Sequence, residues 1–589
     1  MEDDELALLR DTAARIAESL RPADTTRLMA ADDARAAAVL ERAGLTGMRA
    51  AGATAAQVAV VATELARTLA PVAYVDVAVD GESGDRAAFT LALVCADLVG
   101  VARGALDDAL QHARTRTQFG RAIGSFQAVA HLAAEAAVDL AAAEAFAAHA
   151  AWAVDALPAD EAFAVAAAAR EVCAEAAVSV CETAIQILGG MGMTWEHLAH
   201  VRLRRAHAAR RRKVDKRATV GLPDLRGLDS SAEAGFRAEL VDWIGGFGTV
   251  AATDEGQGRP RLAWHRALYS AGYVGVSFPA ASGGRGMPAA YEAVVNDELG
   301  FRGMPPAPPI GHLAHALRRF GSDAQRETYL ADLLSGAVAW CQGFSEPGAG
   351  SDLAALTTKA RREGDAYRVN GTKIWTSDAV DSDRCLLLCR TGEAGHRGLS
   401  MLIVPMDAPG VRVDPIVTAF ETREFAQVFF DDVRVPAVDR LGAEGDGWAI
   451  AMALLAYERG PADIGWTSRL AAAVADMRGR GTGGDPVLAH RLDHAERWLY
   501  ALRLRVRARL HARDTDGAAA DHDPGPEGSI DKLLLTRVDK LIGRLRLDLL
   551  GDEAMTGYLW SRAAGIYGGT EQIQRDIVAQ RVLGLPRGR

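Results

Sequence analysis

The chain has 589 residues, of which 49% are hydrophobic and 24% are charged, and its formal net charge is −11. This length exceeds what one hydrophobic core organises, so we expect two to four domains in a globular protein. The negative charge disfavours nucleic acid as a partner, and six scattered cysteines without a His cluster beside them predict neither a metal site nor a disulfide framework.

The N-terminus reads Met-Glu-Asp-Asp-Glu and lacks the basic, apolar and small-residue order of a signal peptide. We find no apolar run of about twenty residues, which is the length that a membrane span needs. We therefore expect a cytoplasmic protein without a membrane span.

Residues 1–212 are predicted to be almost entirely helical. Apolar residues recur at helical spacing from Leu6 to Leu20, and residues 56–69 repeat that pattern. An irregular patch is expected at Tyr74–Arg86, and the Ala-rich sequence beyond it favours long helices.

A basic run, Arg202–Lys213, is followed by a polar segment that contains Gly221 and Pro223. This composition predicts a domain linker over residues 213–234. We expect the basic run to close a helix and to begin the linker, not to bind nucleic acid.

The second half has a different order of elements. Residues 235–340 are predicted to be helical, residues 341–440 supply about six strands, and helices return over residues 441–589. The first half looks like the same plan without the β-domain, which is an architectural repeat and not a short-period one.

The stretch Cys341–Asp352 opens the β-rich part. Its Pro and Gly residues permit a tight path, along which backbone N–H groups and the Ser345 and Ser351 hydroxyls can face a ligand. Asn370-Gly371 follows between alternating residues and predicts a hairpin turn there. Together these elements indicate a small β-module that holds a flat or anionic cofactor, although an ordinary turn followed by a hairpin fits them equally well.

Several motifs then resemble the signatures of flavin-dependent acyl-CoA dehydrogenases, and the resemblance covers nearly the whole chain in two copies. The motifs are Arg116-Thr-Gln-Phe-Gly120, Ser125-Phe-Gln127 and Gln186-Ile-Leu-Gly-Gly-Met-Gly192 in the first half, and Gly343-Phe-Ser-Glu-Pro-Gly-Ala-Gly-Ser-Asp352, Asn370-Gly-Thr-Lys-Ile-Trp-Thr-Ser377 and Ile566-Tyr-Gly-Gly-Thr-Glu-Gln-Ile-Gln-Arg575 in the second.

The resemblance implies a mostly α fold with one β-domain. A degenerate helical half (1–212) and a linker (213–234) would precede a helical N-terminal domain (235–340), a β-barrel-like middle domain (341–440) and a four-helix C-terminal bundle (441–589). The preceding partial copy would lack most of the β-domain.

In the family each FAD bridges two subunits, and here each half carries only one side of that bridge. The resemblance therefore implies one complete FAD site per chain, with a second site empty, and the forked guanidinium of Arg116 on the pyrophosphate. The expected FAD contacts are Arg116, Gln118, Phe119, Gln127, Gln186, Gly189 and Gly190 from the first half, and Phe344, Ser345, Gly350, Ser351, Trp375, Ser377, Thr570 and Gln572 from the second.

The catalytic base is expected at a position that differs from many family members. They carry a Glu directly before the Gly-Thr of the last motif, where this chain has Gly568. Other branches place the base in a Glu-Arg pair on an earlier helix, and Glu458 is the one acid in such an apolar helix. Arg459 is expected to position Glu458 or the CoA part, and Glu571 is the second candidate for the base.

By resemblance the reaction is α,β-desaturation of an acyl thioester, with the α-proton taken by Glu458 and the β-hydride by flavin N5. The thioester oxygen would bind the Gly568 N–H and a ribityl hydroxyl of FAD, with Ser351 beside the substrate. A glycine at position 568 leaves room for a bulky or branched acyl group, and steroid side-chain CoA esters are one analogy.

We expect an electron-transfer flavoprotein as electron acceptor and a homodimer of the fused chain. Three alternatives stay open from the sequence. They are a dehydrogenase acting on an acyl carrier protein thioester in biosynthesis, a flavin monooxygenase of the same architecture, and a non-catalytic partner that only binds CoA esters.

Overall fold

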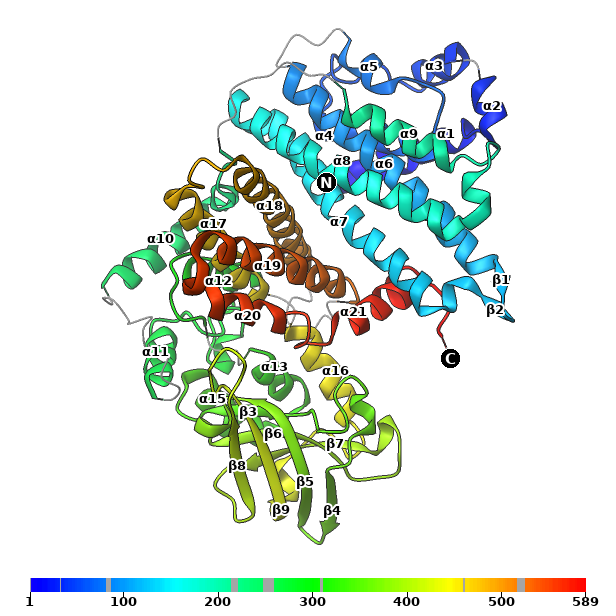
Figure 1. The fold of residues 1–589 in the computed structure, drawn as a ribbon. Coiled ribbons are helices and arrows are strands. Elements are labelled where there is room, and N and C mark those ends of the chain that lie inside the picture. The colour runs from blue at the N-terminus through cyan, green and yellow to red at the C-terminus, as the bar shows by residue number, and fades with distance from the viewer. Residues whose placement is uncertain are drawn as a thin grey trace.

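A computed structural model describes residues 2–31, 33–80, 86–212, 221–246, 259–307, 311–458, 461–515 and 525–588. Figure 1 shows three tiers: the helices of the first half, the C-terminal helices of the second half, and the β-domain farthest from the first half. The helix α16 (Gly447–Glu458) leads from the β-domain back into the helical region.

The first half is helical, as predicted, around three long helices. The patch expected to be irregular at Tyr74–Arg86 is partly a helix, because Tyr74 and Val75 are buried and hold α5 against the core. The elements are α1 (Glu2–Ser19), α2 (Thr25–Met29), α3 (Asp33–Arg42), α4 (Ala55–Thr68), α5 (Tyr74–Val79), α6 (Arg86–Thr115), the short strands β1 (Thr117–Gln118) and β2 (Arg121–Ala122), α7 (Gln127–Ala156), α8 (Ala159–Leu188) and α9 (Ala199–Arg210).

The long helices correct one expectation from the sequence. Arg86–Thr115, Gln127–Ala156 and Ala159–Met193 are each long and apolar enough to cross a membrane by length and composition. The structure buries 89%, 72% and 56% of their most apolar windows, respectively, within the fold. Packing between helices therefore accounts for much of this apolar surface.

The basic run lies in α9 and closes a helix, as expected. Arg202 is buried and binds Asp108 and the Arg67 carbonyl, and Arg205 pairs with Asp97. These two charges face inward and fix α9 against α6, whereas Arg204, Arg210 and Arg211 of the same run are exposed.

The second half repeats the helical plan. The segments Ala55-Ala-Gln-Val-Ala-Val-Val-Ala-Thr-Glu-Leu65 and Ala289-Ala-Tyr-Glu-Ala-Val-Val-Asn-Asp-Glu-Leu299 share seven residues at matching positions and form the corresponding helices α4 and α12. The helices are α10 (Ser231–Gly246), α11 (Arg259–Ser270), α12 (Ala289–Phe301), α13 (Gly311–Phe320), α14 (Asp323–Gln325), α15 (Ala331–Ser335), α16, α17 (Pro461–Arg480), α18 (Pro486–Thr515), α19 (Gly528–Leu550), α20 (Met555–Ala563) and α21 (Glu571–Ile577).

The β-domain is one sheet with the order β10-β7-β6-β4-β5-β9-β8, in which β3 pairs with β6 in parallel. Both Cys385 and Cys389 are buried on β6. The strands are β3 (Trp340–Gly343), β4 (Lys359–Glu363), β5 (Ala366–Ser377), β6 (Arg384–Arg390), β7 (Leu399–Pro405), β8 (Val411–Ile416), β9 (Phe425–Pro436) and β10 (Arg440–Leu441).

The predicted hairpin turn at Asn370-Gly371 is wrong. The turn joining β4 and β5 is Gly364-Asp365, and Asn370-Gly371 forms a bulge inside β5. A Cβ on Gly371 would lie 2.4 Å from the Thr358 hydroxyl oxygen, so this position needs glycine for close approach to its neighbour.

The two halves meet through α7, which packs against α18, α19 and α21. Arg537 of α19 binds Glu135 at 2.6 Å and also Asp139, and Arg575 of α21 binds Glu135. Across the same interface, His494 of α18 approaches Glu175 of α8 at 2.9 Å. The interface therefore fixes α21 relative to the helix that follows β1 and β2.

Candidate functional site

The loop after β3 is anchored by a buried ion pair. Lys373 Nζ of β5 lies 2.8 Å from a Glu346 carboxylate oxygen and donates to the Phe344 carbonyl at 2.9 Å. The Glu346 carboxylate also accepts from the Thr357 and Thr358 N–H groups. Although burial acts to raise it, the Lys373 ammonium and these donors hold the pKa of Glu346 at about 2.

This anchor presents the predicted cofactor residues. The Ser345 carbonyl accepts from Ile374 N at 2.9 Å, so the loop and β5 lie side by side. Phe344 is buried beneath the loop, whereas Gly350, Ser351 and Ser377 are exposed.

Trp375 is turned outward from the sheet. Its φ of 61° lies in the left-handed region, at a register shift between β5 and β9, and its side chain is 57% exposed. One edge of the ring meets Phe425 in a T-shaped contact at 6.2 Å. A large apolar side chain held outward by a strained backbone fits a residue that covers a flat ligand.

The first-half motif residues gather at one end of α6, α7 and α8. Phe119 lies between β1 and β2 with a φ of 52° and is 92% exposed. Arg116 is exposed and, in the parts of the chain that the structure describes, makes no ion pair. The remaining predicted residues of this half, Gln118, Gln127, Gln186, Gly189 and Gly190, are also exposed.

The segment before and within α21 lies between the predicted cofactor residues of the first half and those of the β-domain. Thr570 caps α21 by accepting from Ile573 N, and Gln572 is exposed on its first turn. The chain after α21 returns to the first half, where the Leu583 carbonyl accepts from Arg114. Figure 1 shows β1, β2, α21 and the C-terminus at the same edge of the molecule.

A group of aromatic rings joins this segment to the β-domain. Phe420, in the loop between β8 and β9, meets Trp560 of α20 edge-on at 4.6 Å, and Trp560 lies 6.2 Å from Tyr567. Residues 560–577 therefore contact the β-domain through Trp560 and the first half through α21. No hydrogen bond, ion pair or ring contact within the described ranges joins the first-half motif residues directly to Ser345 or Trp375.

The two positions for a base differ in structure. Gly568 has a φ of 63°, and its carbonyl accepts from Gln574 Nε2 at 2.8 Å. The buried residues Ile450 and Leu454 hold α16 in the core, and Glu458 is its last residue. The Glu458 side chain and Arg459 lie outside what the structure describes.

The second candidate base is held elsewhere. Glu571 binds Lys540 Nζ of α19 at 2.6 Å and lies 3.7 Å from Arg575. Both ion pairs commit this carboxylate to contacts within the C-terminal helices, away from a substrate. This geometry leaves Glu458 as the better candidate.

These residues fit an aromatic, anionic dinucleotide such as FAD. Trp375 and Phe119 offer exposed ring surface, and Arg116 offers a guanidinium that is not committed to an ion pair among the described residues. A Cβ added at Gly189, Gly190, Gly348 or Gly350 would meet nothing within 4 Å, so these backbones border open space. Such a surface can receive both a ring system and a pyrophosphate.

Sequence reasoning missed three residues beside this segment. Lys532 lies over the Tyr567 ring at 3.8 Å, and Asp539 is buried two turns later on α19. Burial raises the pKa of Asp539 to about 6, against the facing Trp466 indole and nearby cationic groups. Trp560 is the third. None has a sequence signature, because each is defined by a partner far away in the chain.

Family models match most of the chain. The acyl-CoA dehydrogenase N-terminal domain model matches residues 248–337, and the middle domain model matches residues 341–433. The C-terminal domain model matches twice, over residues 88–211 and 445–583. The second C-terminal domain is what an unequal fusion of two subunits predicts.

Two relatives from Mycobacterium tuberculosis are similar in sequence. Acyl-CoA dehydrogenase IpdE1 is 38% identical over 385 residues, which cover 60% of this chain and 97% of IpdE1. Acyl-CoA dehydrogenase FadE34 is 33% identical over 545 residues, covering 88% of this chain and 73% of FadE34. Among solved structures, the Tcur3481-Tcur3483 steroid ACAD has 29% identity and a TM-score of 0.55, covering 62% of this chain and all of that one.

Proposed function

The chain belongs to the acyl-CoA dehydrogenase family and is an oxidoreductase of that family, and we propose that it desaturates a bulky or branched acyl thioester with FAD as cofactor. The observation that carries this proposal is the position of residues 560–577. They contact the β-domain through Trp560 and the first half through α21, between two sets of exposed, cofactor-compatible residues.

We assign the α-proton to Glu458. The other family position is Gly568, which has no side chain to accept a proton, and Glu571 is committed to Lys540. The helix α16, which ends at Glu458, is buried at Ile450 and Leu454, and the reaction requires a carboxylate whose pKa is raised towards neutrality by burial. Arg459, the next residue, would orient this carboxylate or the CoA part of the substrate.

The thioester carbonyl needs hydrogen-bond donors, because its α-proton is otherwise too weakly acidic for a carboxylate to remove. The Gly568 N–H is the donor that the chain offers, and Ser351 would lie beside the substrate. Bound FAD would supply the acceptor for the β-hydrogen and its two electrons. Arg116, Phe119, Gln186, Ser345, Trp375 and Thr570 would hold it, together with the other motif residues of the two halves.

This arrangement gives one complete FAD site per chain. An electron-transfer flavoprotein would reoxidise it, and we propose a cytoplasmic homodimer of the fused chain. A bulky polycyclic acyl group is supported by the similarity to the steroid ACAD and by the absence of a side chain at Gly568. A carrier-protein thioester substrate and a monooxygenase reaction would use the same cofactor residues, and a non-catalytic binding role would not need Glu458.

Anaerobic mixing of the purified protein with a panel of acyl-CoAs tests the reaction. The flavin absorbance near 450 nm should bleach with at least one bulky ester. Bound FAD that no ester bleaches would refute the dehydrogenase assignment and favour a binding role.

The matched variants are Glu458→Gln and Glu363→Gln. The second removes an acid from the exposed β4–β5 hairpin, where Glu363 pairs with Arg361. Glu458→Gln should abolish bleaching while FAD stays bound, and Glu363→Gln should behave as wild type. Activity that survives Glu458→Gln means that the base is misassigned. Two FAD per chain after denaturation would contradict the shared site.

A further inference from the structure

One face of α19 lies along the segment that carries Gly568. Thr536 donates its hydroxyl to the Ala564 carbonyl at 3.1 Å, and a Cβ on Gly543 would lie 2.7 Å from the Ser561 hydroxyl oxygen. Lys532 is one turn before Thr536 on this face. The helix therefore holds Lys532 against residues 564–568.

The Lys532 ammonium is directed at the position where other family members carry their base. Its Nζ lies 3.8 Å from the centroid of the Tyr567 ring, and a Cβ on Gly568 would lie 3.9 Å from it. A ring face attracts a cation, so Tyr567 holds the ammonium in this place. The Lys532 side chain is only partly exposed, which limits screening of its charge by water.

Resting on the proposed function, we propose that Lys532 is a positioning residue that keeps positive charge beside the Gly568 backbone and so favours the anionic form of the bound thioester. Removing the α-proton places negative charge on the thioester oxygen, which the Gly568 N–H faces in the proposed site. A fixed cation near that oxygen lowers the pKa of the α-proton without taking part in the proton transfer.

The same contact would disfavour a glutamate base at position 568 of this chain. A glutamate at position 568 would need the left-handed backbone that its φ of 63° imposes. Its carboxylate would also lie close to the Lys532 ammonium, which would favour the charged form and weaken it as a proton acceptor. The base and this cation are therefore separated, on α16 and α19.

The test measures the acidity of a bound thioester apart from turnover. The probe is the 3-thia analogue of the acyl-CoA that bleaches wild-type flavin fastest, in which sulfur replaces the β-carbon and blocks oxidation. Loss of its α-proton gives a long-wavelength absorption band against the oxidised flavin. The pH midpoint of that band reports the pKa of the α-proton.

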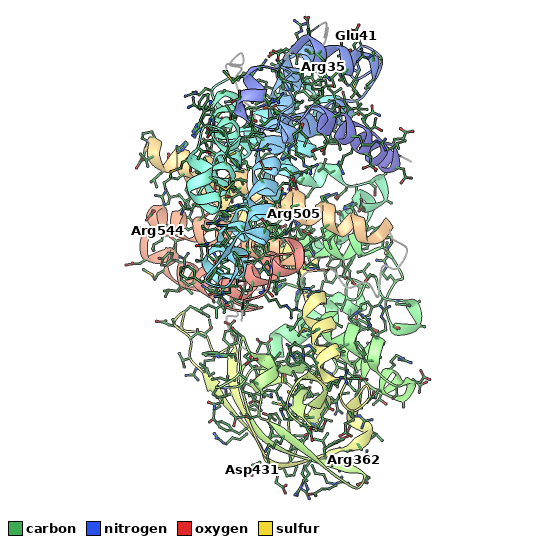
Figure 2. The ribbon with its side chains drawn as sticks, turned by 90° about the vertical axis from the view of Figure 1, so that its right-hand side faces the viewer. Arg35, Glu41, Arg362, Asp431, Arg505 and Arg544 are labelled. Carbon is green, nitrogen blue, oxygen red and sulfur yellow. The ribbon has the colours of Figure 1, made fainter. Side chains whose placement is uncertain are left out.

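Lys532→Gln should move this midpoint upward by roughly one to two pH units, because one positive charge is lost a few ångströms away. Lys532→Arg keeps the positive charge, so its midpoint should stay close to that of the wild type. Lys532→Met keeps the aliphatic stem on Tyr567 and should raise the midpoint by a similar amount. It replaces Lys532→Gln in the test if that variant folds poorly. Arg544→Gln is the matched control: it removes a cation from the exposed face of the same helix and should leave the midpoint unchanged (Figure 2).

The outcomes separate this inference from the proposed function. A wild-type flavin that no acyl-CoA bleaches would refute the proposed function. A bleaching wild type with an unchanged midpoint in Lys532→Gln and Lys532→Met would refute the role of Lys532 alone. Weaker binding of the analogue at an unchanged midpoint would show that Lys532 holds the ligand instead, and would likewise overturn the inference.

Discussion

Replacing Lys373 with methionine should release the loop after β3, which carries Ser345 and Glu346, from the sheet. Lys373 has a fully buried side chain, and the Glu346 side chain beside it is 5% exposed. The substitution keeps the length of the stem but leaves a buried carboxylate without its cation. Glu346 would then either stay charged at high cost or take up a proton and lose its donors.

Two arguments give the size of the effect. The pKa of Glu346 falls from 4.5 to about 2 in the folded protein, and a shift of this size corresponds to about 3 kcal/mol in favour of folding at neutral pH. Removal of one partner from a buried ion pair costs about 3–5 kcal/mol by comparison with other proteins. We therefore expect Lys373→Met to lower the free energy of unfolding by about 3 kcal/mol.

The pH dependence has a definite sign. The pKa of Glu346 is lower in the folded state than in the unfolded state, so the pair contributes its full stability above about pH 4.5. This contribution is lost as the pH falls from 4.5 towards 2. Burial lowers the pKa of Lys373 while Glu346 opposes that fall, and the charged pair is the state we expect at neutral pH.

Urea unfolding, followed by tryptophan fluorescence at pH 7 and at pH 3, measures this difference. Lys359→Met is the control, since it removes an exposed lysine from β4 in the same domain. Lys373→Met should also release FAD more readily, because Ser345 lies on the freed loop. The double variant Lys373→Met/Glu346→Gln should regain part of the stability. A Lys373→Met protein as stable as Lys359→Met at both pH values would refute this account of the loop.

Two further predictions concern the cofactor and the buried acid. Arg116→Ala should weaken FAD binding by roughly 10–100-fold in equilibrium dialysis, because a charge-assisted pair with the pyrophosphate is lost. Arg35→Ala, on α3 at the far end of the first half (Figure 2), should leave FAD binding unchanged. Equal losses of FAD binding in both variants would refute the assignment of Arg116. Asp539→Asn should raise the free energy of unfolding by up to about 3 kcal/mol above pH 6 and by little below pH 4. The reason is that the pKa of Asp539 is about 6 in the folded protein against an ordinary 3.8, so wild-type stability falls as the pH rises from 3.8 to 6. Equal stability of the two proteins at pH 8 would contradict this.

The sequence predicted the helical and β-rich regions because their signals are local. Ala-rich periodicity over α6, α7 and α8 and alternation over β6 and β7 depend on neighbours within one element. The bulge at Gly371 was misread as a turn, since the need for glycine there comes from Thr358 on another strand. A tight turn and a close contact with a neighbouring strand both favour glycine, and the sequence alone could not tell these two causes apart.

The candidate site was predictable only where a motif names its residues. Motif spacing located Ser345 and Arg116, and in the structure Ser345 is half-buried in the loop after β3 whereas Arg116 is exposed. Lys532 could not be found in this way, because its role depends on the path of residues 564–568 past α19. Glu346 was included in a motif, but its ion pair with Lys373 identifies it as an anchor of the loop.

The internal repeat explains why the first half is expected to be chemically silent. Gly100 of α6 crosses α4 so closely that a Cβ would lie 2.2 Å from the Thr63 carbonyl oxygen, and Gly465 of α17 crosses α12 beside Asn296 in the same manner. Because α4 and α12 correspond in sequence, these two glycines mark equivalent points. Counting back seven residues from each, Glu458 corresponds to Leu93.

Leu93 is fully buried in α6, which runs unbroken from Arg86 to Thr115. In the second half, α16 ends at Glu458 and Pro461 begins a new helix. The first half thus has an apolar core residue and a continuous helix where the second half ends a helix on an acid. A Leu93→Glu change would bury an unpaired carboxylate and destabilise the first half without creating a base. If Glu458 is the base, the first half has no acid at the corresponding position, as we expect for a half that only holds the cofactor.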